Sequence, residues 1–328
     1  MQKTNESSFE NLSKGVVYTA FGYEYLLMAA NSVRTARLSN PDLKYEIVTN
    51  IPFDNDALDE RHRFDRVVFV ERDTCKNRLV KTDIINYTNL ELGVFVDCDT
   101  EIIGSLEPMF SCLEKFDIAL KLCAKPTEKI YSVAPGVSSH EFPEWNAGVI
   151  FFRRNERSIA FYRRWNKHFI EEGKNRDQPA LAKTIYDFGN SVRILSLHPM
   201  WNTFPQDRKF LREETVGKVT DASRVWHYRF PECNPETARR IRDVHFIFKK
   251  VIGARNSYLA TEISRVEERY RLIGSFIYRA VFLLHPWIGY RMMDAIRYLG
   301  KLGLCKRNII LSRSESVKGD DYQNVKGG

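Results

Sequence analysis

Residues 93–103 read Gly-Val-Phe-Val-Asp-Cys-Asp-Thr-Glu-Ile-Ile. The apolar half of this stretch predicts a short buried strand. Asp97 and Asp99 follow at the carboxyl end of that strand, where open α/β folds bind their ligands. Because residues i and i+2 of an extended backbone point the same way, both carboxylates can reach one hard divalent cation and the phosphates that it carries. The alternative is that the two aspartates only end the strand and begin a turn.

Short apolar runs and amphipathic helix patterns alternate around this strand. We expect the strands at residues 15–19, 45–49, 66–70, 93–96, 118–122 and 147–152. We expect the helices at residues 24–38, 77–88, 158–171 and 178–186. Alternation at this spacing predicts an α/β fold with a mostly parallel sheet and crossover helices, extending to about residue 235.

The composition is that of an ordinary globular protein. Of 328 residues, 43% are hydrophobic and 28% are charged, enough to bury a sizeable core. The six cysteines lack the spacing of metal or redox motifs, which predicts reduced thiols in a cytoplasmic protein. The polar residues 1–14 lack the apolar segment of a signal peptide and are expected to form a flexible tail. No apolar run in the sequence is long enough to span a bilayer.

The net charge of +8 comes from the C-terminal part of the chain. Residues 236–313 contain 16 Lys or Arg against 6 Asp or Glu, and apolar residues with helical spacing form one face from Leu259 to Leu284. We therefore predict a basic amphipathic helical extension over residues 236–312, followed by a disordered tail at 313–328. Residues 257–304 could pack on the rest of the chain, form a homodimer, or contact the inner, anionic face of a membrane peripherally. No recognition motif accompanies the charge, so nucleic acid is not expected as a partner.

Several stretches, taken in chain order, share residues with a known family. They are Val16–Tyr23 (Val-Val-Tyr-Thr-Ala-Phe-Gly-Tyr), Arg78–Lys81 (Arg-Leu-Val-Lys), Asp97–Asp99, Glu144–Phe152, Arg176–Gln178 and Val225–Tyr228 (Val-Trp-His-Tyr). Together they resemble the GT-A nucleotide-sugar glycosyltransferases, most closely family 8, the glycogenin and bacterial galactosyltransferase type. The resemblance covers about residues 15–235 and implies a Rossmann-like, mixed and mostly parallel sheet flanked by helices.

The resemblance implies a nucleotide site at the first strand. Thr19 and Tyr23 match positions that hold the uracil base, with an aromatic ring stacking on it, and Val17 is placed in the same nucleotide site. Ala20 stands where the family often has an Asn. Lys81 matches a lysine that approaches the diphosphate and the donor sugar, whereas Arg78 is more simply read as an exposed helix residue.

The resemblance also implies a metal site. Asp97 and Asp99 match the aspartates that bind Mn²⁺ or Mg²⁺, and Cys98 between them should point away from the metal. His227 matches the third protein ligand, a set that suits Mn²⁺. His198 is a competitor, which we place instead in a structural loop.

A sugar site is the third implication. Asn146, followed by Ala147, matches an Asn that reaches the donor sugar, and Asp177 and Gln178 match a pair that binds sugar hydroxyls near the anomeric carbon. Asp177 could alternatively serve only as a helix N-cap. The family's Gly and Lys after the late His are missing here, so either Arg229 supplies the positive charge or the lid is absent.

The predicted protein is thus a metal-dependent hexosyltransferase that uses a UDP-sugar and a glycan or lipid-linked acceptor. The resemblance implies retention of configuration, with Asp177, Lys81 and Gln178 as the catalytic group, while an inverting enzyme could use Asp177 or Glu144 as its base. One alternative is an inactive relic that binds nucleotide-sugar or glycan. The other is a sugar-phosphate nucleotidyltransferase, which needs a Gly-rich basic loop where residues 15–25 offer only two glycines.

Overall fold

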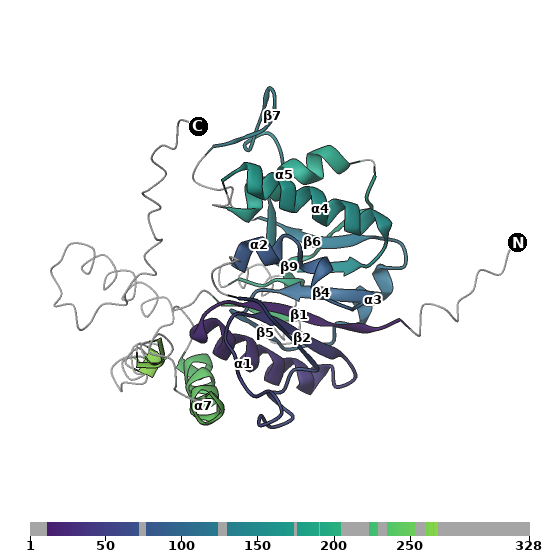
Figure 1. Cartoon of the computed structure of the whole chain (residues 1–328). Helices are drawn as coiled ribbons and strands as arrows, with labels where there is room; N and C mark the ends of the chain where they lie inside the picture. The colour runs from purple at the N-terminus through teal and green to yellow at the C-terminus, as the bar shows by residue number, and fades with distance from the viewer. Residues whose placement is uncertain are drawn as a thin grey trace, which may run out of the picture.

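The structure is a computed structural model (Figure 1). It describes residues 12–71, 77–123, 130–173, 176–189, 191–204, 223–228 and 235–252, together with 260, 262–264 and 266–267. The predicted N-terminal tail, apart from its last residues, lies outside these ranges, as do Arg229 and everything after residue 267.

The centre of the protein is a seven-stranded sheet with the order β10-β6-β9-β4-β1-β2-β3. Its strands are β1 (Lys14–Ala20), β2 (Lys44–Thr49), β3 (Arg66–Phe69), β4 (Leu92–Val96), β6 (Ile118–Leu122), β9 (Trp145–Arg153) and β10 (Ile194–Ser196). All neighbouring strands are parallel except β9, which is antiparallel to both β4 and β6. The predicted α/β fold with a mixed, mostly parallel sheet is therefore confirmed.

Helices cover both faces of the sheet (Figure 1), and each face packs against its own apolar core. Along β1, Val16 and Tyr18 enter the core that contains α1 (Tyr23–Ser39), α3 (Glu107–Cys112) and α7 (Pro235–Val251). Val17, between them, enters the opposite core, which contains α2 (Asn77–Lys81), α4 (Glu156–Glu171) and α5 (Asp177–Phe188). This alternation is the two-residue period of a strand that is buried on both faces.

The predicted helix over residues 77–88 is two pieces, α2 and the 3-10 turn η2 (Ile84–Asn86). An α-helix would need the carbonyl of Leu79 to accept from the amide of Asp83. Here that carbonyl accepts from the Thr82 hydroxyl at 3.1 Å and from the Asn166 side chain at 3.1 Å, and the Asp83 amide donates to Val80 instead. Side-chain competition for the backbone thus ends the helix at Lys81.

Two short antiparallel pairs complete the fold. The hairpin β7 (Ser132–Ala134) and β8 (Val137–Ser138) lies beside α5. The second pair joins β5 (Thr100–Ile102), directly after the Asp-Cys-Asp stretch, to β11 (Val225–His227). This pair brings a segment from far along the chain to the end of β4.

The described start of the basic extension packs on the α/β unit. Helix α7 lies against α1 and contributes Ile241, Val244 and Phe248 to the same core. Its Arg240 guanidinium donates to both carboxylate oxygens of Glu101, each at 2.8 Å. A domain division at residue 235 stays a prediction. None of the described helices is long and apolar enough to cross a membrane.

Candidate active site

Asp97 and Asp99 lie at the end of β4, in a backbone held from both sides. The Asp97 amide donates to the carbonyl of Gly148 at 2.8 Å, and the Asp97 carbonyl accepts from the Thr100 hydroxyl at 2.8 Å. The Asp99 carbonyl accepts from the Tyr228 amide at 3.0 Å. Both carboxylates are about a quarter to a third exposed, so they are fixed in place but open on one side.

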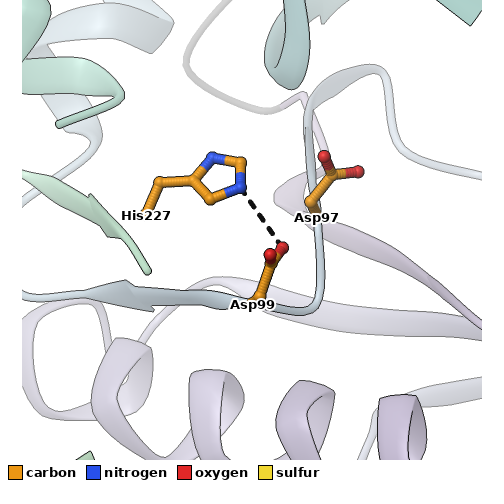
Figure 2. A group of neighbouring side chains, drawn as sticks. All are labelled: Asp97, Asp99 and His227. Atoms are coloured by element: carbon orange, nitrogen blue, oxygen red, sulfur yellow. Dashed lines mark ion pairs between the residues drawn. The ribbon is translucent and has the colours of Figure 1, made fainter. Parts of the chain in front are cut away.

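His227 reaches the two aspartates through the β5–β11 pair. In that pair His227 is the partner of Thr100, next to Asp99. His227 Nε2 consequently lies 3.2 Å from Asp99 Oδ1, and one ligand atom from each of the three side chains lies within 4.8 Å of the others (Figure 2). Two carboxylates and an imidazole form a ligand set that suits Mn²⁺, so the residues present fit a divalent cation.

The charges around the cluster differ between the two carboxylates. Burial raises the pKa of Asp97, and the nearby charge of Lys81 opposes this only in part. Burial acts on Asp99 in the same direction, but the charge and hydrogen bond of His227 outweigh it and lower the pKa of that carboxyl. Two carboxylates this close, one of them harder to ionise than an ordinary aspartate, constitute a site that gains from an added positive charge.

Gly148 makes room for this cluster. A Cβ atom at this position would lie 2.5 Å from Cε1 of His227 and 3.0 Å from Oδ2 of Asp97. From the sequence, Gly148 was only one residue of the Glu144–Phe152 stretch. In the structure, it is the residue whose missing side chain lets two predicted metal ligands approach each other.

Lys81 connects the cluster to the start of α5. Its Nζ lies 2.9 Å from Asp97 Oδ1 and 3.0 Å from Asp177 Oδ2. Burial alone would lower the pKa of Lys81, but the charges of Asp177 and Asp97 outweigh it, so that pKa lies above its usual range. Conversely, burial would raise the pKa of Asp177, but the charge of Lys81 holds it below its usual range. Lys81 is thus a fixed positive charge between the two carboxylates.

The other residues of the predicted sugar site lie at the starts of β9 and α5. Asn146, half-buried at the start of β9, accepts a hydrogen bond from the Gly148 amide through Oδ1 at 2.8 Å, while Ala147 is buried. The Gln178 side-chain amide lies 3.4 Å from the sulfur of Cys123. Arg78 is exposed, with Nε 3.9 Å from Asp177.

The predicted nucleotide residues on β1 are buried. Val17 is enclosed in the core, and the Thr19 carbonyl accepts from the Cys98 thiol at 3.1 Å. Burial raises the pKa of that thiol well above its usual range, and the neighbouring carboxylates add to this. The Cys98 side chain thus bonds to β1. On either side of it, Asp97 faces Lys81 and Asp99 faces His227.

Tyr23 lies in a different environment from the one expected of a base-stacking ring. Its side chain is fully buried, and its hydroxyl lies 2.9 Å from Nδ1 of His245 on α7. Its backbone amide donates to the Glu262 carboxylate at 2.9 Å. Stacking on a base would require the ring to leave this packing, and its role in nucleotide binding stays a prediction.

The structure distinguishes between the two candidate histidines, His198 and His227. His198 is exposed and caps the 3-10 turn η3 (Pro199–Trp201), where Nδ1 accepts from the Met200 amide at 3.3 Å. His227 is the histidine that joins the aspartates. Arg229 lies outside the described residues, so its proposed contact with the phosphates stays a prediction.

Three residues around His227 had no functional role in the sequence analysis. Asn202 is fully buried, and its Oδ1 lies 3.0 Å from Nδ1 of His227. The Phe204 ring stacks on the imidazole with a centroid distance of 4.3 Å. Lys121 donates to the Asn202 carbonyl at 3.0 Å and lies over the Phe204 ring. Asn202 belongs to the segment around His198 that was predicted to be a structural loop, but nothing in the sequence of that loop indicated a contact with His227.

Comparison with known proteins gives structural likeness and no sequence match. No family model matches the chain, and no curated protein matches it. Galactosyltransferase LgtC, solved with donor and acceptor sugar analogs, is 13% identical with a TM-score of 0.49, over 76% of this chain and 99% of LgtC. GlyE from Streptococcus pneumoniae TIGR4 is 13% identical with a TM-score of 0.49, over 77% of this chain and 64% of GlyE. The bifunctional WbbM is 13% identical with a TM-score of 0.47, over 78% of this chain and 52% of WbbM.

Proposed function

We propose that the protein is a metal-dependent glycosyltransferase. It moves a sugar from a nucleoside-diphosphate donor, expected to be a UDP-sugar, to a hydroxyl of a glycan or lipid-linked acceptor. The observation that carries this proposal is the Asp97, Asp99 and His227 cluster at the carboxyl end of β4, where α/β folds bind ligands. The solved structures of similar fold include glycosyltransferases, which is the class of enzyme that the motifs predict.

In this proposal Asp97, Asp99 and His227 hold Mn²⁺ or Mg²⁺. When bound, the ion would neutralise the negative charge of the diphosphate. Transfer breaks the bond between the anomeric carbon and the phosphate oxygen and forms one to the acceptor oxygen, and the acceptor proton passes to the departing phosphate or to solvent. Negative charge therefore develops on the departing phosphate, and the ammonium of Lys81, held beside Asp97, is placed to stabilise it.

Asp177 and Gln178 are assigned to the donor sugar. They begin α5, on the other side of Lys81 from the cluster. Lys81 keeps Asp177 ionised, so this carboxylate would accept hydrogen bonds from sugar hydroxyls. Asn146 would contact the same sugar from β9. Retention of configuration is the outcome that we propose from the family resemblance.

The test is calorimetric titration with UDP, GDP and CDP, each with and without Mn²⁺. We expect UDP binding that requires Mn²⁺ and is lost in Asp99→Ala, because the variant removes one ligand of the ion. Asp42→Ala, at an exposed aspartate on the loop before β2, is the matched control and should bind as the unchanged protein does. A wild-type protein that binds no nucleotide in a metal-dependent way would overturn the proposal.

The second candidate is an inactive relic of the same fold. It is favoured by Ala20, which replaces a frequent contact residue of the family. Binding of UDP with Mn²⁺, but no hydrolysis of any UDP-sugar and no transfer, would support the relic. Release of UDP from a UDP-sugar that depends on Asp97 and Asp99 would exclude it.

The acceptor side of the proposal involves the basic extension. Lys249 and Lys250 of α7 are exposed, together with Phe246. We propose that the extension contacts an anionic membrane surface peripherally, which would suit a lipid-linked acceptor. Flotation with vesicles of anionic lipid tests this, and a dimer in sedimentation without flotation would favour the homodimer instead.

A further inference from the structure

A line of hydrogen bonds runs from the backbone of β9 to the imidazole of His227. The Gly148 amide donates to Asn146 Oδ1 at 2.8 Å. Asn146 Oδ1 is also 2.8 Å from Asn202 Nδ2, and Asn202 Oδ1 is 3.0 Å from His227 Nδ1. Asn202 and His227 are both buried, with exposed fractions of 0% and 6%.

The first member of this line fixes the direction of all the others. A backbone N–H can only donate, so the Asn146 atom facing Gly148 must be its oxygen. That oxygen can then accept from Asn202 only if the amide nitrogen of Asn202 faces it. The remaining end of the Asn202 amide is an oxygen, and it faces Nδ1 of His227. Nδ1 must therefore carry a hydrogen.

The consequence lies at the other nitrogen of the ring. With Nδ1 acting as the donor, the lone pair of a neutral imidazole is on Nε2. Nε2 is the atom that lies 3.2 Å from Asp99 Oδ1 (Figure 2). With a second hydrogen on Nε2 the ring is charged and donates to Asp99, the form that lowers the pKa of that carboxyl. Without that hydrogen, the lone pair and the carboxylate oxygen point at the same place and repel each other, and a cation between them takes the place of the missing proton. Imidazole ligands of metals are commonly held in this way, through a hydrogen bond at the nitrogen that does not bind.

We propose that Asn202 is a positioning residue that fixes His227 with the hydrogen on Nδ1, presenting Nε2 to the cation site. The line of hydrogen bonds from Gly148 through Asn146 and Asn202 to His227, here called the relay, also joins the cation site to the predicted sugar site, because Asn146 belongs to both. The geometry of the relay is independent of the reaction, whereas its purpose rests on the proposed function.

The relay has a second consequence, for the donor sugar. Asn146 Oδ1 accepts two hydrogen bonds, from Gly148 and from Asn202, which uses both of its lone pairs. Nδ2 is the part of this side chain that the relay leaves for a ligand. Asn146 would thus donate to an oxygen of the sugar and would not accept from a sugar hydroxyl.

The test reads the hydrogen on Nδ1 directly. Nitrogen NMR of histidine-labelled full-length protein at about pH 9, where an ordinary imidazole is neutral, distinguishes a nitrogen with a hydrogen from one without. The His227 signals are identified by their loss in His227→Gln. We expect Nδ1 of His227 to carry the hydrogen in the wild type. Asn202→Leu should lose this preference, whereas Asn202→Asp, which keeps an acceptor opposite Nδ1, should retain it.

A second measurement follows the cation alone. Titration of Mn²⁺ followed by electron paramagnetic resonance should show affinity that is about 10- to 100-fold weaker in Asn202→Leu. Asn86→Leu, at an exposed asparagine on η2, is the matched control and should bind Mn²⁺ as the wild type does. If Asn202→Leu does not fold, Asn146→Ala interrupts the relay one step earlier and should likewise mix the two forms of the ring.

The two proposals fail in different ways. A bare Nδ1 in the wild type, or an unchanged Nδ1–H in Asn202→Leu, would overturn the relay whatever the protein catalyses. A wild type with Nδ1–H that is lost in Asn202→Leu, but with no affinity for Mn²⁺, would support the relay and overturn the proposed metal-dependent transfer.

Discussion

The ammonium of Lys81 lies 3.0 Å from the carboxylate of Asp177, and the two side chains are only 9% and 12% exposed. The pair joins the last residue of α2 to the first residue of α5. Because Lys81 also contacts Asp97, it links a predicted metal ligand to a predicted sugar ligand. The ion pair therefore belongs to the site and to the packing of the two helices at once.

Replacing Lys81 tests both roles. Lys81→Met keeps the length of the side chain but leaves the buried Asp177 with only the exposed and more distant Arg78 as a counter-charge. Removing one partner of a buried ion pair destabilises proteins by about 3–5 kcal/mol, and we expect a value near the lower end because Asp97 is partly exposed. Urea unfolding gives this value, and sugar transfer should be lost in variant protein that is still folded.

The control is Lys115→Met, at an exposed lysine, which should change stability by less than about 0.5 kcal/mol. Equal stability of the two variants would contradict the buried pair.

A single methyl group at Gly148 should disrupt the cluster without changing its charge. In Gly148→Ala the new Cβ would meet His227 at 2.5 Å and Asp97 at 3.0 Å, so at least one of them must move. We expect Mn²⁺ affinity to fall by at least about tenfold, comparable to the loss of a supporting contact around a metal. Gly189→Ala is the matched control, because its Cβ would meet nothing closer than 3.6 Å and its φ is −50°. Unchanged Mn²⁺ affinity in Gly148→Ala would place the cation elsewhere.

The α/β architecture could be predicted because its signals are local. Each expected strand of the sheet was found within about two residues, since apolar runs and flanking turns carry that information in the chain itself. The position of Asp97 and Asp99 followed from the strand before them. His227 could be placed beside them only through the family resemblance, because the β5–β11 pairing that brings it there is non-local.

The contacts that sequence reasoning missed are all long-range. Asn202 and Asn146 are 56 residues apart, and their hydrogen bond depends on how η3 packs on β9. Tyr23 and His245 are 222 residues apart, and the packing of α7 on α1 decides whether the tyrosine ring is buried. Neither residue type nor spacing encodes such a contact, so a motif match alone assigned Tyr23 to the nucleotide.

The free energy of unfolding should depend on pH through the carboxyl of Asp117, which is not a residue of the candidate site. This carboxyl is fully buried, and although burial alone would raise its pKa, hydrogen bonds from Arg193, Arg157 and Asn155 hold that pKa well below its usual range. A lowered pKa contributes stability above the unfolded value of about 3.9, and this contribution is lost as the pH falls from there through the folded pKa.

Asp117→Asn removes this contribution. Hydrogen bonds to a charged group are worth about 1.5–3 kcal/mol, so the variant should be less stable than the wild type by roughly that amount at neutral pH. The difference should shrink as the pH falls below about 4, because the carboxyl of the unfolded wild type takes up a proton there while that of the folded protein is still ionised. Urea unfolding across this range measures it, and Asp42→Asn, at an exposed aspartate, provides the control. A difference that stays constant with pH would contradict the assigned cause.

The Tyr23 hydroxyl decides between packing and base stacking. Tyr23→Phe removes the hydrogen bond to His245 and should lower the free energy of unfolding by about 1 kcal/mol. Tyr162→Phe is the matched control, because the Tyr162 hydroxyl is buried and has no hydrogen-bond partner among the described residues, so its removal should be close to neutral.

If the Tyr23 ring stays packed when UDP binds, calorimetry should give the same UDP affinity for Tyr23→Phe and the wild type. The packing of the ring favours this result over the predicted stacking, because burying such a side chain is worth about 1.5–3 kcal/mol, as much as stacking on a base returns, and the bond to His245 would be lost as well. If the ring instead moved out to the base, binding would have to break the bond to His245, and a variant without that bond would bind UDP about fivefold more tightly.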